Sequence, residues 1–221
     1  FCEMGPLLRI EPAGLLYIKV KVEDCEEIIE ESIINDRVIE RLVYHDQEGK
    51  AYEKQEEIPF YKQQTRVALE DCGRINAESI KEYIAVGGYS AVAKALFDMT
   101  PQQIVDEISE ASLRGRGGGG FPTGRKWAQV LAQDSEIKYV VCNGDEGDPG
   151  AFMDRSMMEG DPHRVIEGML IAGIATGAHY GYIYVRAEYP LAVERLQTAI
   201  QKAEEKGLLG KNILNSGFDF D

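Results

Sequence analysis

The sequence predicts an α/β fold with a mainly parallel sheet, because a strand pattern followed by a helix pattern occurs twice. Residues 137–142 and 181–186 are short runs of apolar, β-branched and aromatic residues, which is typical of buried strands. Residues 163–175 and 189–206 follow them with apolar positions at helical spacing. The order strand, helix, strand, helix at this spacing predicts parallel strands joined by right-handed crossovers.

The predicted helices carry start signals in the sequence. Asp161 and Pro162 supply an N-cap and a first-turn proline for the first helix. Thr100 and Pro101 begin another helix in the same way, ahead of the first strand. Residues 76–96 predict a further helical segment, which a pair of glycines interrupts.

Single residues near the second strand carry more specific expectations. His163 lies in the first turn of a helix, so we expect it at the surface rather than as a catalytic base. Arg186 and Glu188 follow the end of the strand and are secondary ligand candidates, because ligands of α/β sheets bind beyond the carboxyl ends of strands. The alternating tyrosines of this strand are expected to pack in the sheet rather than to form a stacking platform: Tyr180, Tyr182 and Tyr184.

A loop of unusual composition, residues 113–127, precedes the first strand. Six glycines fall within ten residues, and three arginines and a lysine flank them. Glycine lets backbone N–H groups approach a ligand closely, and cations around such a loop favour an anion, most often a phosphate. Phe121 and Trp127 indicate a flat group beside that phosphate, which predicts a nucleotide or a flavin.

Two common phosphate loops do not account for this segment. The spacing Gly115-x-Gly117-x-x-Gly120 matches the dinucleotide fingerprint, but a helical pattern precedes it where that motif requires a strand. A Walker A loop would need Lys and Ser/Thr where Arg125 and Lys126 stand. A flexible linker is the remaining simple explanation, and the interleaved arginines are poor linker material.

A second loop, residues 143–150, follows the first predicted strand and is rich in turn-forming and acidic residues. Asn143 offers both donor and acceptor groups, and Asp145 and Glu146 are acceptors for ring N–H or ribose hydroxyl groups. Alone, this segment would be read as a solvated acidic turn. The glycine-rich loop and this acidic loop together form a highly specific sequence pattern.

The two loops resemble the NADH-binding flavoprotein subunit of respiratory complex I and its relatives in NAD(P)-dependent hydrogenases and formate dehydrogenases. The family pattern is close to Arg-Gly-Arg-Gly-Gly-Ala-Gly-Phe-Pro-Thr-Gly-x-Lys-Trp, followed by Asn-Ala-Asp-Glu-Gly-Glu/Asp-Pro-Gly. Gly119 and Gly144 stand here in place of alanines, and Gln129 replaces an aromatic residue that often helps to sandwich adenine. This last departure leaves the choice between NADH and NADPH open.

The resemblance implies a Rossmann-like FMN-binding domain that transfers hydride between NAD(P)H and FMN and passes single electrons to iron–sulfur clusters. It implies that Lys126 neutralises phosphate or reduced flavin, that Glu146 orients the nicotinamide, and that Phe121 contacts adenine. The residues implied in cofactor binding are Gly115, Arg116, Gly117, Gly118, Gly120, Phe121, Lys126, Asn143, Asp145, Glu146, Gly147 and Asp148.

The front of the chain resembles the last part of the thioredoxin-like [2Fe-2S] domain that often precedes this flavoprotein. Cys2, within Phe-Cys-Glu-Met-Gly-Pro, would be one cluster thiolate, and its three partners would lie upstream. The expected organisation is a partial thioredoxin-like domain over 1–45, a linker over 46–62 and an incomplete FMN/NADH-binding domain over 63–221. The chain is therefore expected to be an internal fragment, without the [4Fe-4S] domain of the family.

Composition excludes several other classes of function. A net charge of −14 argues against a nucleic-acid partner, and no apolar run is long enough to span a membrane. Four widely spaced cysteines and no signal segment indicate a cytoplasmic protein, which the resemblance makes a subunit of a larger redox complex. Two alternatives remain open: a non-catalytic assembly module of the same fold, and a subunit of a ferredoxin:NAD oxidoreductase.

Overall fold

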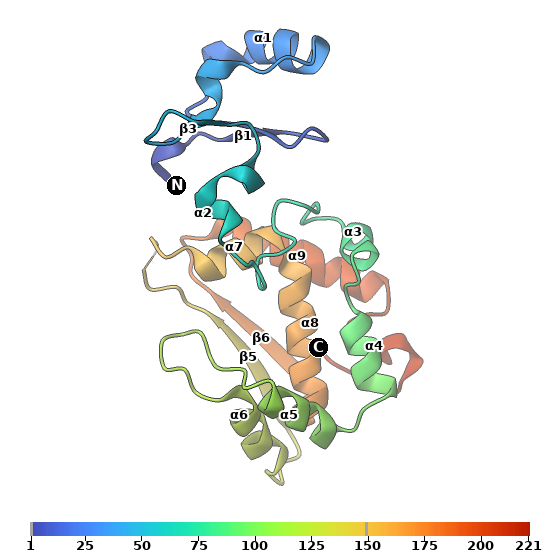
Figure 1. The fold of residues 1–221 in the computed structure, drawn as a ribbon. Coiled ribbons are helices and arrows are strands. Elements are labelled where there is room, and N and C mark those ends of the chain that lie inside the picture. Colours follow the sequence, from blue (N-terminus) through green and yellow to red (C-terminus); the bar gives the residue numbers. More distant parts are fainter. Residues whose placement is uncertain (1, 149) are drawn as a thin grey trace. The chain divides into compact units, whose positions relative to one another are not determined.

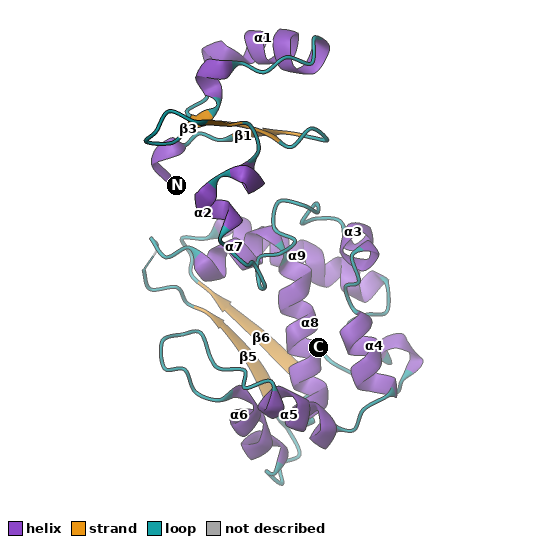
Figure 2. Cartoon of the chain, viewed as in Figure 1, coloured by secondary structure: helices purple, strands orange, loops and turns teal. Residues whose placement is uncertain are grey.

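The computed structural model describes residues 2–148 and 150–221, apart from the side chain of Cys2, and separates the chain into two units (Figure 1). The first unit ends at Arg66, and the second comprises Val67–Asp221. Both units contain short strands and helices, as Figure 2 shows by colour. No helix within the described ranges is long and apolar enough to cross a membrane.

The second unit is built on two parallel strands, β5 (Tyr139–Gly144) and β6 (Tyr180–Val185), in a register that pairs Tyr139 with Tyr180 and Gly144 with Val185. Helix α8 (Pro162–Thr176) connects them, so the predicted strand–helix–strand order and the α/β class are confirmed. Asp221 continues the sheet beyond β6: its N–H donates to the carbonyl of His179 over 3.0 Å, and its carbonyl accepts from Gly181 over 2.7 Å.

Helix α8 covers one face of this strand pair and forms the centre of the main core. Leu170 and Ala175 on α8 are fully buried, and Cys142 and Ile183 on the strands pack against the same core. Asp161 caps the helix through its side chain, as predicted, and Gly177 ends it in the left-handed conformation. The other helices of this unit are α3 (Ile80–Ala85), α4 (Ser90–Phe97), α5 (Pro101–Glu110), α6 (Thr123–Leu131), α7 (Met153–Gly160) and α9 (Pro190–Glu205).

The opposite face of the strand pair is exposed, which corrects the prediction of fully buried strands. Val141 is 63% exposed and Tyr182 is 60% exposed, and Asn143 lies on the same face. Side chains alternate between the two faces of a strand, and the α8 side alone receives the core here. The tyrosines of β6 are therefore not buried sheet packing: Tyr180 and Tyr182 contact Tyr139 with tilted rings at an exposed surface, with ring centroids 5.8 and 5.9 Å from it.

Helices α5 and α6 pack closely on either side of the glycine-rich loop. Gly124, in the first turn of α6, lies so near α5 that an added Cβ would come within 2.8 Å of the Ser109 Cα. Thr100 begins α5 with the predicted cap, and its hydroxyl oxygen accepts from the N–H of Gln103. A glycine is thus required at this crossing because the two backbones leave no room for a side chain.

The first unit is formed by two hairpins and a helical segment. Strands β1 (Leu8–Ile10) and β2 (Leu15–Tyr17) pair antiparallel, as do β3 (Tyr44–His45) and β4 (Ala51–Tyr52). Short helix α1 (Cys25–Glu27) continues into a π-helical stretch, Ile28–Ile34.

Residues 46–62, for which the sequence predicts a linker, are folded as part of this first unit. They contain β4 and helix α2 (Pro59–Lys62), and Ile58 is 1% exposed in a cluster with Leu16 and Tyr52. The N–H of Leu16 donates to the carbonyl of Glu53 over 2.7 Å. The segment is highly charged, yet its apolar side chains find partners in the hairpins, and this pairing is not visible in composition.

Candidate functional site

The glycine-rich loop is closed at its base by backbone hydrogen bonds. The N–H of Gly115 donates to the carbonyl of Phe121 over 2.9 Å, and the N–H of Thr123 donates to Leu113 over 2.8 Å. Arg114 reaches across the loop and donates from Nη1 to the carbonyl of Gly120 over 3.1 Å. The segment is therefore a defined hairpin-like loop that leads into α6, and not a flexible linker.

The tip of this loop presents bare backbone to solvent. A Cβ added at Gly117, Gly118 or Gly119 would meet no atom within 4 Å, and Gly118 has φ of +99°. The N–H groups of these three residues donate to no acceptor within the described part of the chain. Successive unpaired N–H groups at an exposed turn are suited to bind an anion.

Cationic residues flank the glycine tip in the sequence, Arg116 before it and Arg125 and Lys126 after it. Arg125 and Lys126 lie over the ring of Phe121, at 5.7 and 5.9 Å from its centroid, and this ring is 42% exposed. Neither of them, nor Arg116, takes part in an ion pair with any residue of the described ranges. In a chain of net charge −14 this loop is a local positive site.

The acidic loop begins at the carboxyl end of β5, where the fold class places ligand sites. Oδ1 of Asn143 accepts from the N–H of Asp145 over 2.9 Å, and Oδ1 of Asp148 accepts from Gly150 over 3.0 Å. Gly144 approaches β6 so closely that an added Cβ would lie 2.9 Å from the carbonyl oxygen of Tyr184. Asp145, Gly147 and Asp148 are exposed.

Glu146 differs from its neighbours because its side chain turns inward and is 7% exposed. Its carboxylate accepts from the N–H of Met153 over 2.5 Å and from the N–H of Arg155 over 3.1 Å, so it caps the N-terminus of α7. Burial, and secondarily the charge of Glu146, raises the pKa of Asp154 above its usual range. The expected contact of Glu146 with nicotinamide stays a prediction.

The two loops are not joined by a hydrogen bond or an ion pair between described residues. Each loop is positioned by its own element, the glycine-rich loop by α6 and the acidic loop by the end of β5. A ligand that contacts both would therefore supply the link between them.

The proposed cluster thiolate of Cys2 lies outside the described side chains. Cys25 and Cys142 are free thiols, and the thiol of Cys72 donates to the carbonyl of Ser156 over 3.8 Å. No group of three or more metal-binding side chains occurs among the residues that the structure describes.

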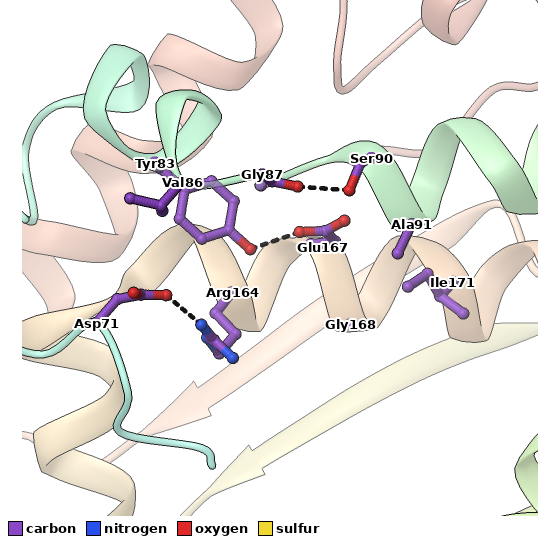
Figure 3. A pocket seen from close by; sticks show the side chains of 11 residues that line it. Asp71, Tyr83, Val86, Gly87, Ser90, Ala91, Arg164, Glu167, Gly168 and Ile171 are labelled. Atoms are coloured by element: carbon purple, nitrogen blue, oxygen red, sulfur yellow. Dashed lines mark hydrogen bonds and ion pairs between the residues drawn. The ribbon is translucent and has the colours of Figure 1, made fainter. Parts of the chain in front are cut away.

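A polar cluster that sequence reasoning missed lies between the α3–α4 turn and α8. A hollow of about 310 Å³ is bordered by Tyr83, Arg164 and Glu167, whose side chains are labelled in Figure 3, and none of them is a predicted site residue. Arg164 donates to Asp161 over 2.8 Å and also pairs with Asp71. The signal available in the sequence was the pair of charged residues, Arg164 and Glu167, within a largely apolar helical stretch.

His163 belongs to this cluster, and the expectation of a surface position is wrong. It is 1% exposed, its ring stacks on that of Tyr83, and its Nδ1 lies 2.9 Å from the hydroxyl of Tyr89. Burial lowers the pKa of His163 to about 4, so the ring is neutral at pH 7. The first turn of α8 is covered because α3 and α4 fold back onto it.

Comparisons with known proteins agree with the two-loop pattern. Residues 108–217 match the family model of the Nuo51 FMN-binding domain. The chain is 57% identical over 160 residues to the NADP-reducing hydrogenase subunit HndC of Solidesulfovibrio fructosivorans, a match that covers 72% of this chain and 32% of that protein. It is 51% identical over 143 residues to an NADH-quinone oxidoreductase subunit of Aquifex aeolicus (strain VF5), a match that covers 65% of this chain and 33% of that one.

A solved structure supports the fold over nearly the whole chain. It is an NAD+-reducing [NiFe]-hydrogenase in the air-oxidized state, with a TM-score of 0.51 and 23% identity. The similarity covers 92% of this chain and 32% of that one. The chain thus spans about a third of the length of the relatives it matches (32% and 33% for the two curated proteins).

Proposed function

We propose that the chain, which belongs over residues 108–217 to the family of Nuo51 FMN-binding domains, is the FMN-binding part of an electron-input module. In the complete protein this module oxidises NAD(P)H, or reduces NAD(P)+, and passes single electrons to iron–sulfur clusters. The observation that carries the proposal is the open glycine tip: in the part of the chain that the structure describes, its three N–H groups have no acceptor, and Arg116, Arg125 and Lys126 have no acidic partner. A dianionic phosphate matches this tip in charge and in the donors it requires.

The residues present fit FMN. Gly117 and Gly118 have free space where a Cβ would stand, so the phosphate can approach their N–H groups directly. Lys126 has no acidic partner among the described residues and can neutralise the phosphate or a charge on the ring. When bound, FMN supplies hydride acceptance and stepwise electron release, and the protein supplies position and electrostatics.

The acidic loop supplies the polar contacts on the other side of this site. The amide of Asn143 lies on the exposed face of β5 and offers donors to the ring. Asp145 is exposed and can accept from ribose or ring N–H groups. Phe121 provides an exposed apolar surface for a nucleobase. The further residues proposed for cofactor contact are Gly115, Arg116, Gly120, Glu146, Gly147 and Asp148.

The finer organisation of the complete protein is part of the same proposal. We place the first unit as the end of a thioredoxin-like [2Fe-2S] domain with Cys2 as one thiolate, followed by a Rossmann-like FMN domain. The partners are other subunits of a cytoplasmic redox complex of the hydrogenase, formate dehydrogenase or complex I type. The resemblance of the motifs and the names of the relatives support this placement.

Titration of the purified protein with FMN, followed by quenching of flavin fluorescence, tests the binding proposal. We expect saturable binding that weakens about tenfold or more in Lys126→Ala and Asn143→Ala, since each removes a hydrogen bond to a charged or polar group. Lys94→Ala is the matched control, because Lys94 pairs with Glu107 across α4 and α5 and touches neither loop. Absence of FMN binding by the parent protein would favour a non-catalytic assembly module.

A further inference from the structure

Arg186 joins the carboxyl ends of the two parallel strands. It follows Val185, the last residue of β6, and its side chain is 27% exposed. Its Nη1 donates to the backbone carbonyl of Glu146 over 3.0 Å, and its Nε lies 3.8 Å from Oδ1 of Asp145. Nη2 donates to Glu188 over 3.1 Å, which holds the guanidinium from its outer side.

The acidic loop receives three separate restraints from the surrounding structure. Gly144 abuts the carbonyl of Tyr184, the carboxylate of Glu146 caps α7, and the carbonyl of Glu146 accepts from Arg186. The first restraint fixes the start of the loop, and the second holds the side chain of Glu146. Arg186 contacts both the main chain and an acidic side chain in the middle of the loop, namely the carbonyl of Glu146 and the carboxylate of Asp145.

We propose that Arg186 is a positioning residue that holds residues 145–147 in the conformation required for cofactor binding. This inference rests on the proposed function, in which the acidic loop contacts FMN. Arg186 itself acts through the loop: its donors are directed at Glu146 and Asp145, and Glu188 engages a further N–H.

The geometry requires a guanidinium and not merely a positive charge. A planar guanidinium directs several N–H donors along fixed lines, so one side chain can bind a carbonyl and two carboxylates at once. Lysine has a single mobile ammonium group and can replace only part of this arrangement. We therefore expect Arg186→Lys to be intermediate between the parent protein and Arg186→Gln.

The test compares Arg186→Gln and Arg186→Lys with Arg195→Gln. Arg195 is a matched control, because its side chain is 25% exposed and it pairs with Glu78 over 2.6 Å, a residue outside both loops. We expect the Kd for FMN to rise about tenfold or more in Arg186→Gln, less in Arg186→Lys, and to stay within about twofold in Arg195→Gln. Equal Kd values for Arg186→Gln and Arg195→Gln would overturn the proposal.

Backbone amide hydrogen exchange without FMN separates this inference from the proposed function. We expect Arg186→Gln to speed exchange at residues 145–148 selectively, while Arg195→Gln does not. If the parent protein bound no FMN, the proposed function would fail, and the exchange result would still decide whether Arg186 orders the loop. Unchanged exchange at residues 145–148 in Arg186→Gln would show that Arg186 does not order the loop.

Discussion

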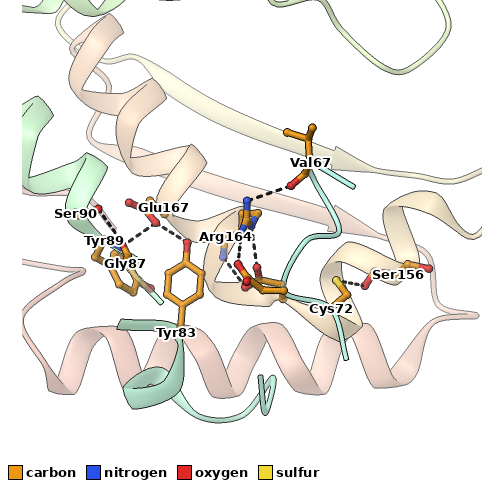
Figure 4. A network of polar contacts seen from close by, with 11 residues as sticks. Val67, Cys72, Tyr83, Gly87, Tyr89, Ser90, Ser156, Arg164 and Glu167 are labelled. Carbon is orange, nitrogen blue, oxygen red and sulfur yellow. Dashed lines mark hydrogen bonds and ion pairs between the residues drawn. The ribbon is translucent and has the colours of Figure 1, made fainter. Parts of the chain in front are cut away.

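The hydroxyl of Tyr83 donates a hydrogen bond of 2.5 Å to the carboxylate of Glu167, and both side chains are buried (Figure 4). The same carboxylate accepts from the backbone N–H of Tyr89 over 2.9 Å and from that of Val92 over 3.4 Å. These donors offset the cost of burying a carboxylate, and they fasten the α3–α4 turn to α8. Burial, followed by the bond to Glu167, raises the pKa of Tyr83 well above its usual range.

Tyr83→Phe should destabilise the protein by about 1–3 kcal/mol, because Glu167 loses its side-chain donor while it remains buried. Urea unfolding followed by circular dichroism measures this change. Tyr182→Phe is the control: it removes a hydroxyl from a side chain that is 60% exposed, so stability should stay within about 0.5 kcal/mol. Equal effects of the two substitutions would mean that the bond to Glu167 contributes nothing.

Gly124→Ala should destabilise the second unit by about 1–3 kcal/mol or more, because the new methyl group collides with the backbone of Ser109. Gly168→Ala on α8 is the opposite case: its Cβ would meet no atom within 4 Å. We expect it to stabilise the helix by roughly 0.5–1 kcal/mol. Thermal unfolding of both variants checks the pair, and a neutral Gly124→Ala would show that α5 and α6 are not in close contact.

The buried His163 should make stability fall with acidification below pH 6.5. Its pKa is about 4 in the folded protein and 6.5 in the unfolded chain, so the unfolded state binds a proton first as the pH falls. The stabilisation is complete above pH 6.5 and is lost between 6.5 and about 4, with a total of about 3 kcal/mol.

Urea unfolding at intervals between about pH 7.5 and 4.5 measures this dependence on pH. His163→Gln should flatten the profile, whereas His45→Gln should not, because His45 is exposed. If the variant does not fold, a direct NMR titration of the parent protein measures the pKa of the His163 ring. A ring that titrates near its ordinary pKa of 6.5 would contradict the buried position.

Gly117 and Gly118 should respond differently to alanine. Gly118 has φ of +99°, so Gly118→Ala strains the backbone and should shift the loop amide resonances even without ligand. Gly117→Ala meets no protein atom and should leave the loop unchanged, yet its methyl group occupies the space expected for phosphate. We expect Gly117→Ala to raise the Kd for FMN roughly tenfold or more. If Gly117→Ala left the affinity for FMN unchanged, the phosphate would not bind at this tip.

Local sequence signals predicted the regular elements of the second unit well. Asp161 and Thr100 cap the helices that their positions indicated, and β5 and β6 lie where the apolar runs stand. These signals succeed because capping and periodicity involve residues a few positions apart. The glycine-rich loop and the acidic loop were identified for the same reason, since each carries its chemistry within one short segment.

Contacts between distant segments were not predictable in this way. His163 is buried because Tyr83 and Tyr89 cover it from helices far earlier in the chain, and Ile58 is buried because Leu16 and Tyr52 surround it. The inward orientation of Glu146 likewise depends on the N-terminus of α7.

The sequence by itself determined the α/β order of elements, the helix starts and the two loops that we propose as the cofactor site. The tertiary structure alone decided how the side chains of these loops are engaged: Lys126 has no ion-pair partner among the described residues, whereas the carboxylate of Glu146 accepts from the N-terminus of α7. The physical reason is that propensity and periodicity act over a few residues, while burial and charge pairing depend on segments that only the fold brings together.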